Sequence, residues 1–325
     1  LLLFKPLVKT MEIYIMKLNK IKLALGFVTA ATLAMPMVAS AAADQEKAMK
    51  DASNWAHPRG QHDNQAYSKL TQINKGNVKN LKAAWTLSTG VNRGHEGSPV
   101  VVGNMLYVHT AFPNNVYALD LNNNQKVVWS YFPKQDPSVQ AVLCCDNVNR
   151  GLGYGDGKIF LQQNDGMLVA LDAKTGAKVW DVRNTDPKVG ATNTNAPHVI
   201  KDKILTGCSG AEFGVRCFIA AYNIADGSLA WKAMSTGSDA DALIGADFNK
   251  DTPLYSNLSS YEDVNGGNKQ GGSFKKIPNS QLKGGTTDLG LKTWLKPQAV
   301  KDGWQHGGGS TWGWWPYDAK TNLVY

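Results

Sequence analysis

A phrase that recurs about every fifty residues restricts this chain to a small set of folds. Four tryptophans follow one another at intervals of 44, 51 and 51 residues: Trp85, Trp129, Trp180 and Trp231. The last three close a similar phrase, in which an alternating apolar run, a turn of Asp, Asn or Gly and a second apolar run occupy 118–129, 170–180 and 221–231. Alternating apolar residues on both sides of such a turn predict two antiparallel strands with one buried face.

A second pair of short strands is predicted ahead of each phrase, at 99–108, 155–161 and 198–205. Four strands in about fifty residues, ending in a tryptophan, are typical of a propeller blade. One blade cannot bury both faces of its sheet, so the blades must stack radially. We therefore expect an all-β propeller whose tryptophans dock one blade on the next rather than contact a ligand, and the 32 glycines and ten tryptophans agree with many turns and packed aromatics.

The period breaks after Trp231. Residues 236–306 are rich in Gly, Asn, Ser, Asp and Lys and predict a loop insertion. Blade sequence resumes at 307–318, and the chain ends at Tyr325 in a predicted strand. Three to four blades are present, so we expect residues 44–325 to form part of a larger propeller domain.

The first 43 residues predict a leader for export. A cationic segment at 16–22 precedes an apolar run of about seventeen residues at 23–39, and small residues at 39–43 offer a cleavage site. Residues 1–15 fit neither region and are interpreted as upstream sequence. The alternative is a membrane anchor, but the run is short, contains Gly and Thr and lacks a basic flank after it, so no stable anchor is expected.

The net charge of +8 gives little support for a nucleic-acid partner. The leader holds five lysines and one glutamate, which leaves +4 for the remainder, and a mildly basic domain is no sign of nucleic-acid binding.

Export would permit disulfides for all four cysteines. Adjacent Cα atoms lie about 3.8 Å apart, below the usual disulfide range, so the pair Cys144 and Cys145 is either a strained vicinal disulfide or two unbonded thiols.

Five phrases occur in a fixed order at 95–99, 144–150, 188–197, 209–214 and 309–314. Together they resemble the large subunit of the periplasmic PQQ-dependent methanol dehydrogenases, from about residue 52 to the end. The resemblance implies an eight-bladed β-propeller with pyrroloquinoline quinone (PQQ) and one metal ion at its axis, of which this chain holds about the first half. It also implies the vicinal disulfide.

The resemblance also assigns roles to single residues. Glu96 and Arg150 match groups that hydrogen-bond the quinone, Trp312 matches the indole below it, the Cys144–Cys145 disulfide matches the cap above it, and Glu212 matches a metal-binding carboxylate. The other matching cofactor contacts are Thr194, Ser209, Gly210, Ala211 and Ser310. Chemically the set is suitable, because a flat polyanion needs an aromatic floor and cationic or hydroxyl donors around its rim. Without the family, Arg150 and Glu96 would be interpreted as surface ions, Glu212 as a turn residue and Trp312 as core.

Two departures from the family pattern are visible. Ser310 stands where the family usually has Thr, and the catalytic Asp base of the family is expected beyond Tyr325, so no catalytic residue is assigned within the chain. Cys208 and Cys217 flank Glu212, and either a hairpin disulfide or two buried thiols would suit them.

The function implied is oxidation of methanol or a similar small primary alcohol in the periplasm, with electrons passing to a c-type cytochrome. A homodimer is expected, with a small subunit as an open alternative. Segments 156–162 and 168–176 resemble the lanthanide-using Xox-type branch more than the calcium-using one. The rival functions are a PQQ dehydrogenase for ethanol or larger alcohols, and a non-catalytic propeller scaffold, which would carry a lipidated Cys after the leader.

Overall fold

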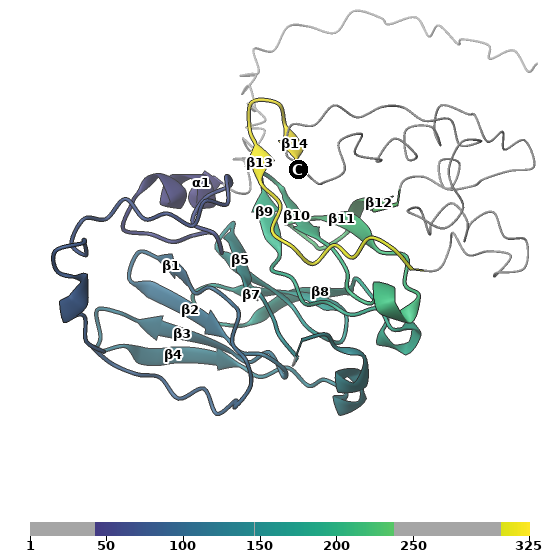
Figure 1. Ribbon diagram of the computed structural model, residues 1–325, viewed down its shortest axis with the longest axis horizontal. Helices are drawn as coiled ribbons and strands as arrows, with labels where there is room; N and C mark the ends of the chain where they lie inside the picture. The colour runs from purple at the N-terminus through teal and green to yellow at the C-terminus, as the bar shows by residue number, and fades with distance from the viewer. Residues whose placement is uncertain (1–42, 146, 237–306) are drawn as a thin grey trace, which may run out of the picture. The chain divides into compact units, whose positions relative to one another are not determined.

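The computed structural model of this protein describes residues 43–145, 147–236 and 307–325. The predicted leader, apart from its last residue, and the predicted insertion, apart from its first, lie outside the described residues. The described residues form three complete four-stranded sheets and one two-stranded sheet (Figure 1).

Each four-stranded sheet is an antiparallel meander, in which strands consecutive in sequence are neighbours. The first contains β1 (Val100–Val102), β2 (Met105–His109), β3 (Val116–Asp120) and β4 (Lys126–Tyr131). The second contains β5 (Leu152–Gly155), β6 (Lys158–Gln162), β7 (Met167–Asp172) and β8 (Lys178–Arg183). The third contains β9 (His198–Ile200), β10 (Lys203–Thr206), β11 (Phe218–Asn223) and β12 (Leu229–Met234). The predicted strand pairs are therefore confirmed, and each sheet is a propeller blade.

The remaining elements are short. β13 (Tyr317–Asp318) pairs with β14 (Leu323–Val324). The 3-10 turns are η1 (Val78–Asn80), η2 (Pro137–Val142), η3 (Pro187–Val189) and η4 (Ala211–Phe213). One α-helix, α1 (Ala43–Lys50), was not predicted from the sequence. Its Asp44 accepts hydrogen bonds from the backbone of Asp156 and Gly157, which fixes the helix against the turn between β5 and β6.

The blades share an irregularity and a burial gradient. Each has a register shift between its third and fourth strands, beside Ala118, Ala170 and Ala221. A shift at the same place in all three sheets indicates a recurrent bulge-like irregularity, which increases the twist of the outer strand. Every residue of β5 and β9 is buried, whereas β12 is exposed throughout. The first strand of a blade is thus the inner one.

The inner strands of successive blades lie beside one another. β1 contacts β5, and β5 contacts β9. The segments that lead into β1 and β5 are also joined, through a parallel bridge between Ser98 and Gly151. These contacts arrange the blades radially around a shared axis, as the propeller prediction requires.

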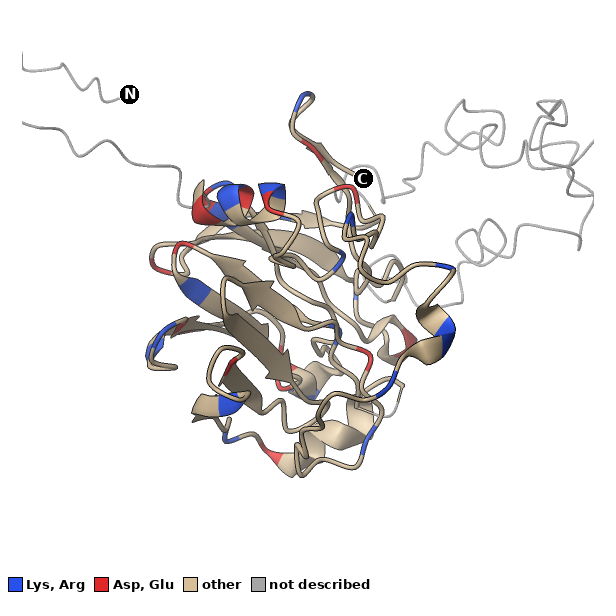
Figure 2. Ribbon diagram, turned by 90° about the vertical axis from the view of Figure 1, so that its left-hand side faces the viewer, with Lys and Arg blue, Asp and Glu red and all other residues tan. Residues whose placement is uncertain are grey.

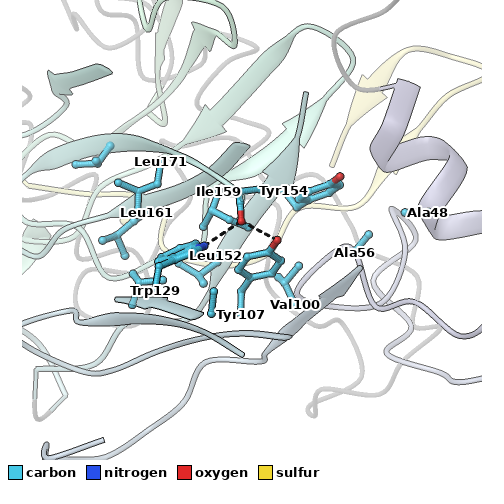
Figure 3. Packing of buried hydrophobic residues seen from close by; sticks show 14 of the residues in the cluster. Ala48, Ala56, Val100, Tyr107, Trp129, Leu152, Tyr154, Ile159, Leu161 and Leu171 are labelled. Atoms are coloured by element: carbon cyan, nitrogen blue, oxygen red, sulfur yellow. Dashed lines mark hydrogen bonds between the residues drawn. The ribbon is translucent and has the colours of Figure 1, made fainter. Parts of the chain in front are cut away.

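Trp129 joins the first blade to the second. Its indole Nε1 donates to the Ala173 carbonyl at 3.1 Å, and the Tyr107 hydroxyl donates to the same oxygen at 3.0 Å (Figure 3). Gly176 lies against the indole so closely that a Cβ there would approach Trp129 Cδ2 to 2.6 Å. Only glycine allows the turn of the second blade to cover this ring.

Trp180 repeats the arrangement one blade later. Its Nε1 donates to the Ile224 carbonyl at 3.3 Å, and a Cβ on Gly227 would lie 2.7 Å from its ring. The prediction that tryptophans dock blade on blade is confirmed for these two. Trp85 and Trp231 are 41% and 45% exposed in the described part of the chain.

Charged residues are scattered over α1, the strands and the turns. Figure 2 shows Lys and Arg interspersed with Asp and Glu on the side that faces the viewer. Within the described part of the chain, no helix reaches the length and apolarity that crossing a membrane requires.

Buried histidines give the fold an expected sensitivity to acid. Burial lowers the pKa of His198, on β9, from 6.5 to about 3, and lowers that of His109, on β2, to about 4. Between about pH 6.5 and 4 the unfolded chain therefore binds protons that the folded chain excludes. As the pH falls through this window, we expect the free energy of unfolding to decrease by about 1 kcal/mol per pH unit for each such histidine.

The variant His198→Leu removes one of these groups, so its unfolding free energy should depend less steeply on pH. Denaturant titrations between about pH 7 and 5 measure that slope. His95→Leu is the matched control, because His95 is exposed. A His198→Leu slope equal to that of the wild type would contradict the prediction.

Candidate functional site

Four of the predicted site residues lie in the loops that lead into the first strands of successive sheets. Glu96 precedes β1, Arg150 precedes β5, Thr194 precedes β9 and Trp312 precedes β13. Because the inner strands β1, β5 and β9 are neighbours, their leading loops come together at one end of the inner strands. Radial stacking therefore brings together residues that are far apart in the sequence.

Arg150 is the centre of this group. Its Nε lies 3.2 Å from Glu96 Oε2. Its Nη1 donates to the hydroxyl of Thr194 at 3.0 Å and to the Thr194 carbonyl at 3.1 Å. Its Cζ lies 4.3 Å from the centre of the Trp312 ring, a cation–π distance. One guanidinium thus links its own loop to three others, those of Glu96, Thr194 and Trp312.

The charge of Arg150 is held in an interior position. The residue is only 5% exposed, and burial lowers its pKa while Glu96 acts in the opposite direction. Arginine remains charged under such conditions. Because the side chain of Glu96 is 45% exposed, the pair leaves positive potential in a largely desolvated position, which favours an anionic ligand.

Ser209 continues the group from Thr194. The two hydroxyl oxygens lie 2.6 Å apart, and the backbone of Ser209 is bridged to Thr192 in both directions. Gly210 follows with a φ of +114° and directly precedes η4, which contains Ala211 and Glu212. Glu212 is exposed, and the turn presents its carboxylate to solvent.

The structure pairs all four cysteines. Cys144 is bonded to Cys145, with the second residue at a positive φ of 62°. Of the two interpretations of the adjacent pair, the vicinal disulfide is therefore the one observed. Cys208 is bonded to Cys217, which decides the other open alternative in favour of a hairpin disulfide.

Some predicted site residues are not joined to the others. In residues 43–145, 147–236 and 307–325, no hydrogen bond or ion pair connects Glu212, Ser310 or the Cys144–Cys145 pair to Arg150 or its partners. Their places in the site remain predictions from the resemblance.

A layer of buried carboxamides beside the site was missed by sequence reasoning. Asn164 is fully buried; its Nδ2 donates to the carbonyls of Val148 and Asn193 at 3.1 and 2.9 Å. Its Oδ1 accepts from Asn114 Nδ2 at 2.8 Å. Asn164 therefore ties the loop of Arg150 to the loop of Thr194. The available signal was a run of three amides after an apolar strand, Gln162 to Asn164.

The donor set fits a flat anionic group such as PQQ. It combines a buried guanidinium, two hydroxyls and an indole, Trp312, that is 43% exposed. The loop of Thr194 also has three buried polar atoms without a partner among the described residues, on Thr192, Asn193 and Asn195. Buried polar atoms in native proteins nearly always have a partner, which can be a ligand or water. For a metal, the exposed carboxylate of Glu212 is the ligand that the resemblance predicts, and the described residues contain no group of three His, Cys, Asp or Glu able to hold an ion.

Comparison with known families identifies this arrangement. Residues 55–253 match the family described as PQQ: glucose/ethanol/alcohol dehydrogenase, beta-propeller domain. This match covers more than half of the chain. The chain belongs to the PQQ dehydrogenase family.

Relatives within the PQQ dehydrogenase family include methanol dehydrogenases. The chain is 47% identical over 290 residues to a lanthanide-dependent methanol dehydrogenase of Methylorubrum extorquens, covering 88% of this chain and 43% of the relative. It is 45% identical over 282 residues to methanol dehydrogenase [cytochrome c] subunit 1 of the same organism, covering 85% and 40%. A solved europium-containing methanol dehydrogenase superposes with a TM-score of 0.67 at 42% identity, covering 86% and 43%.

The chain thus spans less than half the length of these relatives. The propeller fold predicted from the repeat is confirmed by the family match and the structural superposition. The number of eight blades stays a prediction, since the described residues hold three complete sheets.

Proposed function

We propose that the protein to which this chain belongs oxidises methanol, or a similar small primary alcohol, to the aldehyde with PQQ as its cofactor. The observation that carries the proposal is Arg150, buried and bonded to Glu96 and Thr194 beside the exposed indole of Trp312. The similarity to named methanol dehydrogenases supports the substrate.

In this proposal the residues of the chain bind and orient the cofactor. Arg150 and Thr194 donate to its acidic rim, Trp312 supports one face, and the rigid Cys144–Cys145 disulfide covers the other. When bound, PQQ would supply the two-electron oxidising chemistry, and a cation held by Glu212 would supply Lewis-acid stabilisation of negative charge. The desolvated guanidinium strengthens its hydrogen bonds to an anion, because screening by water is weak there.

Glu212 is the proposed metal ligand of this chain. Hard cations bind carboxylate oxygens, and a carboxylate exposed on a turn between two glycines can reach an ion at low cost in desolvation. We propose a lanthanide, on the resemblance of 156–162 and 168–176 to the Xox-type branch. The relatives named as lanthanide-dependent and as cytochrome c-linked differ by only two percentage points in identity, 47% and 45%.

The acceptor, the assembly and the compartment are further parts of the proposal. A c-type cytochrome is supported by the name of the second relative. The periplasm is supported by the leader pattern of the first 43 residues and by two disulfides, which persist in oxidising compartments. A homodimer, with or without a small subunit, stays a prediction from the resemblance.

Reconstitution of the full-length protein tests the function. Purified with PQQ, it should reduce an artificial electron acceptor on addition of methanol, faster with La³⁺ than with Ca²⁺. Ethanol serves as the comparison substrate and separates methanol oxidation from the activity of a dehydrogenase for larger alcohols. Protein that contains PQQ and is inactive on methanol with both metals would contradict the proposal.

A further inference from the structure

We propose that the Cys208–Cys217 disulfide and Thr311 form a clamp that positions Trp312 relative to the loop of Ser209–Glu212. The inference rests on the proposed function, because it gives the clamp a purpose in binding the cofactor and the cation. Neither element belongs to the set of residues that would touch the quinone or the metal. They are positioning residues.

The Cys208–Cys217 disulfide joins the two ends of the loop that carries the candidate ligands. Cys208 and Cys217 are both fully buried, and between them lie Ser209, Gly210, Ala211 and Glu212. Among the described residues, the backbone hydrogen bonds in the middle of the loop are local, from Phe213, Gly214 and Val215 back to Gly210 and Ala211. A loop of this kind is held at its ends, so the covalent bond between those ends restricts where Glu212 can be.

Thr311 bonds to both ends of the same loop, about a hundred residues away in the sequence. Its backbone N–H donates to the Cys208 carbonyl at 2.9 Å, and its hydroxyl accepts from the Cys208 N–H at 2.9 Å. The hydroxyl also donates to the carbonyl of Phe218, the residue after Cys217, at 2.6 Å. Threonine suits this position because its hydroxyl is both donor and acceptor and its branched side chain is stiff.

Gly207 makes this contact possible. A Cβ at this position would lie 1.9 Å from the Thr311 carbonyl oxygen, so any other residue would push the two segments apart. Gly207 thus extends the contact between Thr311 and Cys208 by one residue toward the N-terminus. Backbone hydrogen bonds thus join Cys208 to Thr311 and Ser209 to Thr192, while Gly207 lies in close contact with Thr311.

The clamp links the two parts of the candidate site. Trp312 follows Thr311 directly, and its ring lies against Arg150. Ser209 follows Cys208 directly, and its hydroxyl meets that of Thr194. The distance between the aromatic floor and the Ser209–Glu212 loop is therefore set through the Thr311–Cys208 bonds. Small displacements at such a site weaken binding, which gives the clamp its functional effect.

A pair of variants at Thr311 separates this role from simple stability. Thr311→Val keeps the shape and removes the hydroxyl, whereas Thr311→Ser keeps the hydroxyl. In the full-length protein, we expect Thr311→Val to bind PQQ about tenfold more weakly, the effect of losing two buried hydrogen bonds, and Thr311→Ser to bind nearly as the wild type does. Quenching of tryptophan fluorescence by PQQ measures the affinity, well below the unfolding temperature.

Thr110→Val is the matched control. Thr110 is also fully buried, and its hydroxyl bonds stay within the connection between β2 and β3, to Ala111 and Asn115. This variant should lower the unfolding temperature and leave the affinity for PQQ unchanged. If Thr311→Val behaves as Thr110→Val does, the clamp is overturned and Thr311 is only structural.

The disulfide is tested by the double variant Cys208→Ala, Cys217→Ala, with Eu³⁺ luminescence as the readout of the cation site. We expect about tenfold weaker Eu³⁺ binding and a longer-lived open loop, seen as faster amide exchange at 210–215, while the Cys144–Cys145 disulfide stays intact. Wild-type affinity for both PQQ and Eu³⁺ in this variant would overturn the clamp alone. A wild-type protein that binds neither would overturn the proposed function and the clamp with it.

Discussion

Replacing Arg150 by Gln is expected to lower the affinity for PQQ by about a hundredfold or more. The substitution removes the charge and the fork of donors that reach Glu96 and Thr194, and it removes the guanidinium from the face of Trp312. Charge-assisted hydrogen bonds contribute about 1.5–3 kcal/mol each, so two lost bonds to an anionic ligand account for the factor. Equilibrium dialysis of PQQ against the variant measures the loss.

Two further arginine variants sharpen this test. Arg150→Lys keeps a charge but not the planar fork and should fall between the wild type and Arg150→Gln. Arg183→Gln is the matched control, because Arg183 also donates to backbone carbonyls, those of Asp165 and Thr185, but on the outer strand β8. Equal loss of PQQ binding in Arg183→Gln would show that the effect of Arg150 is not specific to the site.

Replacing Glu212 by Gln should abolish cation binding, with affinity lowered by at least about a hundredfold. The change keeps the shape of the side chain and removes the charge on which a hard cation depends. Because Glu212 is exposed on η4 and makes no hydrogen bond within the described residues, the blades should keep their unfolding temperature. Luminescence of bound Eu³⁺ and the unfolding temperature are the two measurements.

Glu46→Gln controls for loss of an acidic side chain elsewhere, since Glu46 lies on α1 and pairs with His62 at 3.0 Å. It should bind Eu³⁺ as the wild type does. Retention of full Eu³⁺ affinity in Glu212→Gln would remove Glu212 from the metal site and leave the rest of the site hypothesis standing.

The blades were predictable because their signals are local. Alternating apolar residues and Asp–Gly turns predict strand pairs within about ten residues of sequence, and the interval between tryptophans predicts the length of one blade. α1 was missed because its eight residues, Ala43–Lys50, are short, polar and only weakly amphipathic. What holds it is Asp44 at the turn between β5 and β6, a contact more than a hundred residues away in the sequence.

The site was predictable only in part. Residues such as Arg150 and Thr194 stand in phrases shared with a known family, so their types and order carried the information. Asn164 stands in no such phrase, and Thr311 stands in the phrase 309–314 but was assigned no role from it. The importance of both lies in bonds to Val148, Asn193 and Cys208 that exist only once the blades have stacked. Partners distant in sequence leave no periodic signal, so a single sequence gives no means to find them.

The docking of the tryptophans also has a direction. Trp129 is covered by Ala173 and Gly176, and Trp180 by Ile224 and Gly227, so the cover always comes from sequence that is synthesised later. A growing chain can therefore complete a blade only after about fifty further residues have emerged. Until then one indole faces water at the boundary of the folded part. Assembly of the propeller should thus proceed as an ordered series, with a single aggregation-prone surface that moves along the chain as synthesis continues.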